Sequence, residues 1–517
     1  MRINFLHTVT ARDWLPWLFF LLVFLFYTYP MGLSDFWWHM NTGRWIWDNQ
    51  AIPSVDPFTY TYAKDDDIRR VVITRAYYLG QLAYYFLYSF FGIWGLLLFK
   101  AASLTLPLWL LWRCLLAKSV EWRAALMLIA PLPFLLFRFD ELRPHIFSFI
   151  AAILLYWQLE AAVTRLRRGQ YPGALLWWMP LTMLLWSNLH RGFIIGWVLL
   201  LVYGFAEAWQ SVRHKSGYSQ RALPAFLLML AVSFLISLLN PNGANAVLAN
   251  FVELEGPFMS VIDEYFPLYK YAKIYHAGLI FYGAVALVLG LSAVVIRYRR
   301  EMRWPQTLLF LGFAYEGFAT FRFSYFQALM LPALAAPCLA PLSRVLAHRH
   351  HKLLWGGVAL SILALAYGVG IRSALWYGPL ETAYFPEQAA SFIQQHRPPG
   401  RMFNAFEYGG YLGWHLYPDY PVFIDQRNLD FSVYQEYSAA WQGRYQAVFD
   451  KYGINSVVFY GRQPVLLRPP PLVRSLLDDA SWVPVFADSK AVVFVRRQAA
   501  AGMPEVDRDL LRRYLLR

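Results

Sequence analysis

The chain has 517 residues, of which 58% are hydrophobic and only 15% are charged, and its formal net charge at pH 7 is +14. A soluble domain of ordinary composition carries about a quarter charged residues, so this composition excludes a typical soluble protein. Apolar runs of about 17–25 residues, each long enough to cross a bilayer as a helix, recur along the first three quarters of the chain. The basic clusters fall between these runs, which favours cytoplasmic connections of a membrane protein over nucleic-acid binding.

The apolar runs predict a polytopic α-helical membrane protein with about eleven transmembrane helices. The predicted spans are 13–30, 79–112, 122–138, 145–163, 173–189, 193–209, 222–240, 277–296, 305–321, 325–343 and 353–376. The first run lacks a small-residue cleavage site, which favours a retained anchor over a cleaved signal peptide. The second is too long for one simple crossing, so part of 77–92 is expected to be interfacial or strongly tilted.

The connections between the runs alternate in character, and this alternation predicts the topology. The basic set, predicted to be cytoplasmic together with the N-terminus, comprises 112–123, 164–170, 211–221, 297–303 and 344–352. The other set carries acids, aromatic residues and prolines, and it includes two long segments, 31–76 and 240–276, that resemble interfacial helices. We therefore expect a protein of the cytoplasmic membrane with a transmembrane domain over 1–377 and an extracytoplasmic domain over 378–517.

After Tyr377, short apolar runs alternate with helical patterns, which is typical of a small α/β domain. The predicted strands are 401–406, 421–425, 455–460, 482–488 and 491–497, and the predicted helices are 386–396 and 431–452. The tail 505–517 is an amphipathic helix that we expect against the membrane surface.

Ionisable residues gather in the outer connections, several of which are short enough to hold them at the membrane boundary. Such residues are costly at membrane depth and tend to line functional cavities. Asp35 follows the first run among bulky aromatic residues, where partial desolvation should raise its pKa and its basicity. We expect Asp35 to be catalytic and a further set to bind substrate: His39, Asp56, Glu141, Arg143, His190, Arg191, Arg322, Asp425 and Arg427.

Simpler explanations apply to several of these residues. An arginine at a helix end often reaches the lipid headgroups, which is the alternative for Arg322. Asp56 precedes Pro57, and the alternative for it is that it only shapes a turn. The tryptophans Trp37, Trp38, Trp45 and Trp47 are most simply an aromatic belt at the membrane boundary. Asp425 and Arg427 end a predicted strand, where they would bind an acceptor or form a structural ion pair.

No P-loop, glycine-rich dinucleotide motif, HExxH sequence or cysteine cluster is present, so nothing in the sequence indicates a nucleotide or a structural metal. The sequence predicts no firm metal site. If a divalent cation such as Mg²⁺ or Mn²⁺ takes part, Asp35 and Asp56 would supply oxygen ligands, with Asp263 and Glu264 as further candidates.

Several segments carry a family resemblance: "DFWWHMNTGRWIWDNQAIPSVDPFTYT", "RPHIFSF", "NLHRGFIIG", "LNPNG" and "FEYGGYLGWHLYPDYPVFIDQRNLDF". Together they resemble bacterial membrane proteins of the GT-C superfold, a glycosyltransferase-like group. The resemblance implies a polyprenyl-phosphate sugar as donor and transfer on the outer side of the membrane. It also implies that an acid of the first outer loop acts as base or positions the acceptor, which carries over to Asp35, with Asp56 as the second acid. Phe36 follows Asp35, so the paired-acid version of this loop is absent.

The resemblance predicts a glycosyltransferase that moves a sugar to a glycan, lipid or protein acceptor. Sugar transfer from a lipid phosphate needs a base for the acceptor hydroxyl and cations for the departing phosphate. Asp35 would supply the base, and Arg143, Arg191 and Arg322 would hold the phosphate. The alternatives are a transporter or flippase of lipid-linked glycans, and a polysaccharide polymerase or ligase of another membrane fold. Alternating access favours sites near the midplane, which weakens the transporter alternative.

Overall fold

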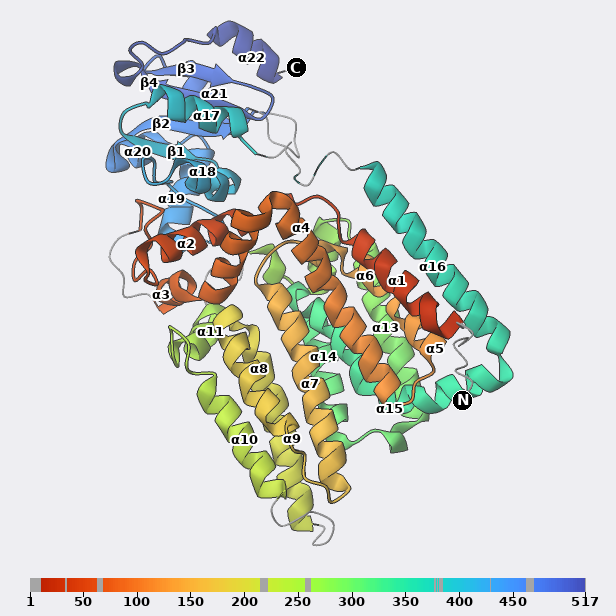
Figure 1. The fold of residues 1–517 in the computed structure, drawn as a ribbon. Helices are drawn as coiled ribbons and strands as arrows, with labels where there is room; N and C mark the ends of the chain where they lie inside the picture. The colour runs from red at the N-terminus through yellow and green to blue at the C-terminus, as the bar shows by residue number, and fades with distance from the viewer. Residues whose placement is uncertain are drawn as a thin grey trace, which may run out of the picture. The chain divides into compact units, whose positions relative to one another are not determined.

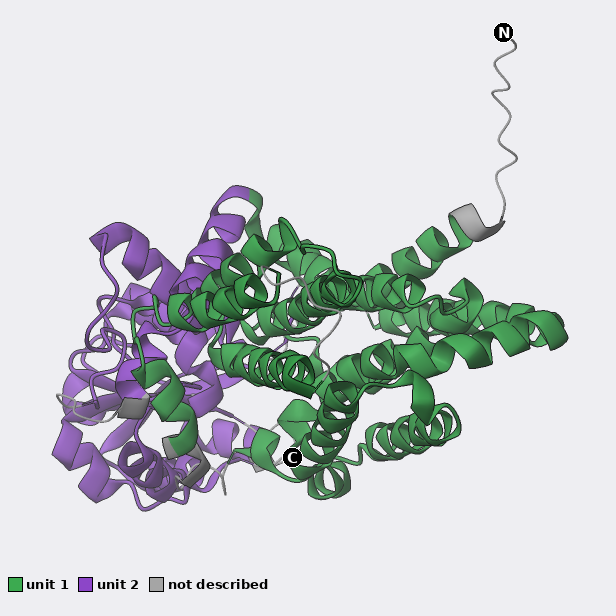
Figure 2. Cartoon of the chain, turned by 90° about the horizontal axis from the view of Figure 1, so that it is seen from below, with its two compact units in different colours: residues 1–30, 91–379 green, residues 31–90, 380–517 purple. Residues whose placement is uncertain are grey.

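The computed structural model describes residues 11–32, 35–62, 68–213, 222–255, 262–375, 378, 380, 385–427, 429–461 and 469–516. Residues 1–10 and most of the basic connection 211–221 therefore lie outside the described part. The chain divides into two compact units: unit 1 holds 1–30 and 91–379, and unit 2 holds 31–90 and 380–517 (Figure 2). Unit 2 thus combines the first predicted outer segment with the C-terminal residues, whereas the predicted division at residue 377 stays a prediction.

Unit 1 consists of apolar helices, and every predicted span coincides with a helix or a pair of short helices (Figure 1). They are α1 (Ala11–Phe26), α4 (Tyr78–Ala117), α5 (Trp122–Ile129), α6 (Leu132–Leu135), α7 (His145–Arg167), α8 (Leu175–Leu189), α9 (Ile194–Arg213), α10 (Ala222–Ile236), α13 (Gly278–Arg297), α14 (Trp304–Ala319), α15 (Ser324–Arg349) and α16 (His351–Ala374), of which α4 begins in unit 2. Among the described residues, six helices are long and apolar enough to cross a membrane, and three shorter apolar helices accompany them. The chain is a polytopic α-helical membrane protein, as its composition predicts.

Two predicted spans are interrupted, each for a local reason. The span 122–138 breaks into α5, α6 and the 3₁₀ turn η1 (Phe137–Phe139), because Pro131 and Pro133 remove backbone donors from a continuous helix. The long helix α4 bends at Gly92, whose φ of 60° and ψ of −158° lie in a region that is essentially restricted to glycine. The expectation that 79–112 is not one simple crossing is confirmed.

The predicted outer segments contain short helices. Segment 31–76 forms α2 (Phe36–Asn49) and α3 (Ile68–Arg75), and segment 240–276 forms α11 (Asn245–Glu255), η4 (Asp263–Tyr265) and α12 (Leu268–Ile274). Further 3₁₀ turns follow α8, α13 and α14, namely η2 (Arg191–Phe193), η5 (Arg299–Glu301) and η6 (Phe321–Phe323). Their helical character agrees with the sequence, and their position at the membrane interface stays a prediction.

The C-terminal part of unit 2 is a small α/β domain, which confirms that element of the predicted fold. Its four strands are β1 (Arg401–Asn404), β2 (Ile454–Tyr460), β3 (Trp482–Ala487) and β4 (Ala491–Arg496), in the sheet order β1-β2-β4-β3. Strands β1 and β2 are parallel and the other pairs antiparallel. The helices are α17 (Glu387–His396), α18 (Gly409–Leu416), α19 (Phe431–Trp441), α20 (Gln446–Tyr452), α21 (Pro471–Asp478) and α22 (Arg508–Leu516).

Two details of this domain differ from the sequence prediction. Segment 421–425 is not a strand of the sheet: the Asn404 side chain binds the backbone of Phe423 and Ile424, and Val422 forms only an isolated bridge with Thr59. The predicted helix 431–452 is divided into α19 and α20 near Gly443, which has a φ of 90°.

The C-terminal tail is helical, as the sequence predicts. In α22, Leu511 and Leu515 are 3% and 2% exposed, so one apolar side of this helix packs within unit 2. Leu510 and Tyr514 of the same helix are exposed, and the expected contact of α22 with the membrane surface stays a prediction.

The backbone conformation of Gly92 should make this position sensitive to substitution. Alanine at this position would be forced into a backbone region that costs about 1–3 kcal/mol, so Gly92→Ala should lower the thermal unfolding midpoint in detergent. Gly290→Ala is the matched control, because Gly290 lies within α13 with no atom within 4 Å of an added Cβ. The control should be neutral or slightly stabilising. Equal midpoints for the two variants would contradict the prediction.

Candidate functional site

Four short segments of unit 1 bring charged groups together. Arg143 lies just before α7, Arg191 in η2, Glu264 and Tyr265 in η4, and Arg322 in η6. The Tyr265 hydroxyl accepts hydrogen bonds from Arg322 Nη1 at 2.9 Å and from Arg191 Nη2 at 3.4 Å. Arg143 forms an ion pair with Glu264, whose second oxygen lies 3.8 Å from Arg322 Nε. The three arginines that the sequence singles out therefore meet on one short turn, and we call this group the arginine cluster.

The arginine cluster is accessible to water and carries more positive than negative charge. The Arg143 and Arg322 side chains are 26% and 33% exposed, and Arg143 Nε lies 2.6 Å from Glu141 Oε2. Burial alone would raise the pKa of Glu264, but Arg143 and Arg322 outweigh this effect and lower the pKa to about 2. Glu264 is thus a permanent anion at neutral pH that holds the guanidinium groups in place.

Two of these arginines sit in turns built alike. A helix ends, one residue adopts an extended conformation, and a 3₁₀ turn carrying the arginine leads into the next helix. His190 has φ −159° and ψ 138° before Arg191, and Thr320 has φ −145° and ψ 122° before Arg322. The Phe321 N–H donates to the carbonyl of Phe266 at 2.8 Å, which ties η6 to the segment after η4. This local geometry brings the arginines toward the same place.

His190 supports one of these turns. Its Nδ1 accepts from the Gly192 N–H at 3.0 Å and lies 2.6 Å from the Ser148 hydroxyl, which itself accepts from Trp186 Nε1 at 2.6 Å. Gly192 is needed here because an added Cβ would lie 2.5 Å from Ser148 Oγ. Through these contacts His190 stabilises the turn. Its predicted contact with a substrate stays a prediction.

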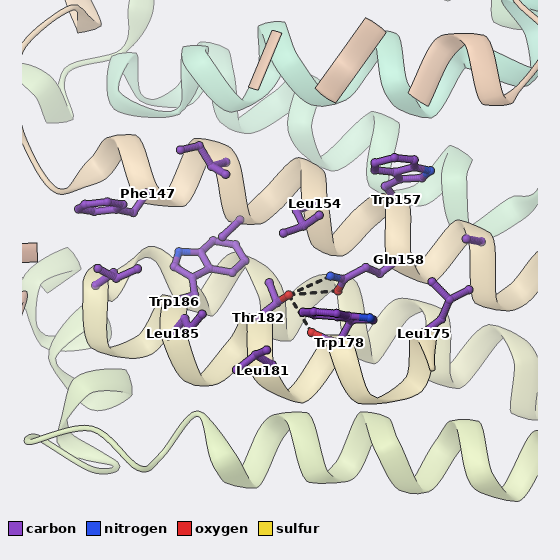
Figure 3. Close-up of a pocket in the computed structure, with 14 residues that line it drawn as sticks. Phe147, Leu154, Trp157, Gln158, Leu175, Trp178, Leu181, Thr182, Leu185 and Trp186 are labelled. Carbon is purple, nitrogen blue, oxygen red and sulfur yellow. Dashed lines mark hydrogen bonds between the residues drawn. The ribbon is translucent and has the colours of Figure 1, made fainter. Parts of the chain in front are cut away.

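An apolar groove lies between α7 and α8 in the same unit (Figure 3). Its volume is about 490 Å³, and its walls are aliphatic and aromatic side chains of the two helices. The principal polar contact in it joins Gln158 Nε2 to Thr182 Oγ1 at 2.9 Å. One end is formed by Phe147 and Leu189, and Leu189 is only two positions before Arg191 in the chain. The groove therefore leads toward one of the turns of the arginine cluster.

Asp35 belongs to unit 2, where it occupies the N-terminal cap position of α2. It is half-buried, and its carbonyl accepts from the His39 N–H at 3.1 Å. Its side chain makes no capping hydrogen bond to the helix. Asp35 and the arginine cluster belong to different units, so the predicted cavity shared between them stays a prediction.

The neighbours of Asp35 are interior residues. His39 is 2% exposed, and its Nδ1 lies 3.4 Å from Gln81 Nε2. Trp37 and Trp38 are 4% and 6% exposed, and Trp37 packs with its ring centroid 5.0 Å from that of Tyr411. The interpretation of these two tryptophans as an aromatic belt is wrong, because residues of a belt must face lipid. Trp47, at 49% exposed, remains compatible with it.

A buried ion group joins two distant parts of unit 2. Arg427 Nη1 donates to Asp56 Oδ1 at 2.6 Å, and Arg427 Nη2 donates to Asp425 Oδ2 at 2.5 Å, with side chains only 2–3% exposed. Burial alone would lower the pKa of Arg427, but Asp425 and Asp56 outweigh it and raise the pKa. Asp56 also accepts from the Thr59 backbone N–H at 3.1 Å. Of the roles left open by the sequence, the contacts support a structural ion pair for Asp425 and Arg427.

The metal candidates come from both units. Asp35 and Asp56 lie in unit 2, whereas Asp263 and Glu264 lie in unit 1. The Asp263 carboxylate accepts from the Tyr275 hydroxyl, and Glu264 pairs with arginines. Within the described residues, no three His, Cys, Asp or Glu side chains are grouped so that they could hold a metal ion. The part of a divalent cation in the reaction therefore stays a prediction.

Sequence reasoning missed Tyr265 and gave Glu264 only a possible metal role. Both lie in "VIDEYFP", a polar interruption of an aromatic segment, and this pattern was the available signal. Their importance follows from the packing of η4 beside η6, which no spacing in the sequence reveals.

Replacing Arg427 should be strongly destabilising. Arg427→Met would leave two carboxylates buried without their cation, at a cost of about 3–5 kcal/mol. Arg397→Met is the control, because the Arg397–Asp419 pair is 74% and 64% exposed, and such pairs contribute about 0–1 kcal/mol. Thermal unfolding of both variants in one detergent measures the difference. An Arg427→Met midpoint equal to that of the control would contradict a structural role for the ion group.

No protein-family model matches the chain, and no curated protein matches it in sequence. The fold is similar to the crystal structure of ArnT from Cupriavidus metallidurans in the apo state, with a TM-score of 0.50, 14% sequence identity, and coverage of 95% of this chain and 99% of that chain. The crystal structure of ArnT from the same organism bound to undecaprenyl phosphate gives a TM-score of 0.49 at 14% identity, covering 96% of this chain and 100% of that chain. The chain thus has an ArnT-like fold, in agreement with the fold that the sequence resemblance implies.

Proposed function

We propose that this protein transfers a sugar from a polyprenyl-phosphate donor to an acceptor on the extracytoplasmic side of the membrane. The observation that carries the proposal is the arginine cluster together with the apolar groove that leads toward it. A polyprenyl-phosphate sugar has an isoprenoid tail and an anionic head, and the two features match these two parts. The GT-C-like fold is the setting in which such chemistry is expected.

The arginines have the geometry to hold the leaving phosphate. Guanidinium groups bind phosphate oxygens through paired hydrogen bonds, and these bonds strengthen as negative charge develops on the departing group. Arg191 and Arg322 share the Tyr265 hydroxyl, and Glu264 orients Arg143 and Arg322. In this proposal, Tyr265 and Glu264 position the arginines and do not bind the sugar themselves.

Asp35 is proposed as the base that accepts the proton of the acceptor hydroxyl. It is half-buried at the start of α2, where its side chain makes no capping hydrogen bond to the helix. Asp56 is less suited to that role, because its oxygens are engaged by Arg427 and Thr59. The experiment below identifies the sugar, the length of the polyprenyl chain and the class of acceptor (glycan, lipid or protein).

The test is to incubate the purified chain with a panel of polyprenyl-phosphate sugars and an extract of envelope glycans and lipids. Release of free polyprenyl phosphate, coupled to labelling of an acceptor, is the expected result. Movement of intact donor across vesicle membranes without release would indicate a flippase instead. No turnover and no movement with any donor would overturn the proposal.

Asp35→Asn should abolish turnover and leave donor binding intact. Loss of a general base lowers rates by about 10²–10⁴-fold, and the neutral amide retains the size of the side chain. Asp48→Asn is the control, because Asp48 is an exposed acid in the same helix α2. Turnover and donor binding are measured separately for each variant. Full activity of Asp35→Asn would contradict the assignment of Asp35 as the base.

Arg322→Gln should weaken donor binding and lower the rate. Each hydrogen bond to a charged group contributes about 1.5–3 kcal/mol, which corresponds to roughly a tenfold to hundredfold loss of affinity. Arg297→Gln is the control, because Arg297 is an exposed cation at the end of α13 outside the arginine cluster. Binding of a polyprenyl phosphate without sugar isolates the phosphate contribution. An unchanged affinity would show that the arginine cluster does not hold the phosphate.

A further inference from the structure

A second cavity of unit 1 has the opposite character to the apolar groove. It has a volume of about 490 Å³ and lies among helix ends in the basic connections that we predict to be cytoplasmic. Five cationic side chains line it: Lys118, Arg167, Arg168, Arg303 and Arg344. They come from the residue after α4, from the end of α7, from the residue before α14 and from α15. We call it the basic cavity.

Ion pairs with two buried carboxylates form one wall of the basic cavity. Glu160 is 2% exposed and pairs with Lys118 at 2.5 Å and with Arg303, while the Tyr203 hydroxyl also donates to it. Glu207 is fully buried and accepts two hydrogen bonds from Arg167, at 2.7 and 3.1 Å. Three of the five cations are thereby held in fixed positions at the wall.

The remaining two cations, Arg168 and Arg344, lie at the open rim. Both are exposed, and no carboxylate among the described residues forms an ion pair with either. The lining contains two carboxylates, Glu160 and Glu301, and the buried Glu207 pairs with Arg167, so five cations face three carboxylates. Like charges so close together are unfavourable unless an anion lies between them. The basic cavity is thus suited to an anion, and its volume is in the range of small-molecule sites.

We propose that the basic cavity binds the phosphate headgroup of an anionic phospholipid from the cytoplasmic leaflet. Its place at helix ends matches the depth of lipid headgroups, and that leaflet is rich in anionic lipid. Arg168 and Arg344 bind the phosphate oxygens from the rim, and the fixed Lys118, Arg167 and Arg303 complete the positive surface. Helix α7 separates the basic cavity from the arginine cluster by roughly 33 Å along its axis, so the two sites are distinct.

The experiment titrates the delipidated full-length chain with phosphatidylglycerol, phosphatidylcholine or inorganic phosphate and counts bound ligand by native mass spectrometry. The chain should bind phosphatidylglycerol about tenfold more tightly than phosphatidylcholine, because only the former carries net negative charge on its headgroup. Arg168→Gln combined with Arg344→Gln should reduce this affinity about tenfold or more. Both residues are exposed at the rim, so the thermal midpoint of the variant should stay unchanged.

The control variant is Arg299→Gln combined with Arg300→Gln, which removes two exposed arginines of η5 that are not among the lining residues of the basic cavity. It should keep the affinity of the native chain for phosphatidylglycerol. Equal losses in the two double variants would show only a general effect of basic charge and would overturn the proposal. Equal binding of phosphatidylcholine would overturn it too. Displacement of the lipid by inorganic phosphate at equal concentration would overturn the assignment to a lipid headgroup.

Discussion

The absence of water in the hydrocarbon region constrains everything else in this protein. Backbone N–H and C=O groups find no partner there except within helices, so irregular backbone is confined to the ends of the spans. The turns that carry Arg191 and Arg322 obey this rule, since each consists of one extended residue and a short 3₁₀ turn between two helices. Chemistry that needs charged groups must therefore be built at helix ends, and both the arginine cluster and the basic cavity are located there.

In both units, buried charged side chains are paired with side chains of opposite charge. In unit 2, Arg427 satisfies two aspartates from segments far apart in the chain, and in unit 1, Glu160 and Glu207 satisfy cations from several helices. A buried ion group of this kind contributes little net stability compared with an apolar replacement, but it penalises any arrangement that separates its members. We infer that these groups select one packing of the elements.

The roles proposed for individual residues follow from their burial and from the groups that they contact. Asp56 and Asp35 have the same side chain and lie in the same outer segment, but the Asp56 side chain is only 3% exposed and pairs with Arg427, whereas Asp35 is half-buried at the start of α2. Likewise, His190 supports a backbone turn, while its neighbour Arg191 reaches the Tyr265 hydroxyl. Burial and partner distinguish a supporting residue from a candidate catalytic or binding residue where residue type alone does not.

The sequence by itself determined the class of protein, the positions of the spans and the α/β character of the C-terminal domain. These follow from the period and length of apolar runs, which are local properties. It also indicated Arg143, Arg191 and Arg322 as a set, because all three fall in short turns between apolar runs. Only the tertiary structure decided that Glu264 and Tyr265 contact these arginines. It also decided that segment 421–425 is not a strand of the sheet and that Trp37 and Trp38 are buried. Those facts depend on contacts between residues far apart in the chain, and pairing of this kind leaves no periodic trace in a single sequence.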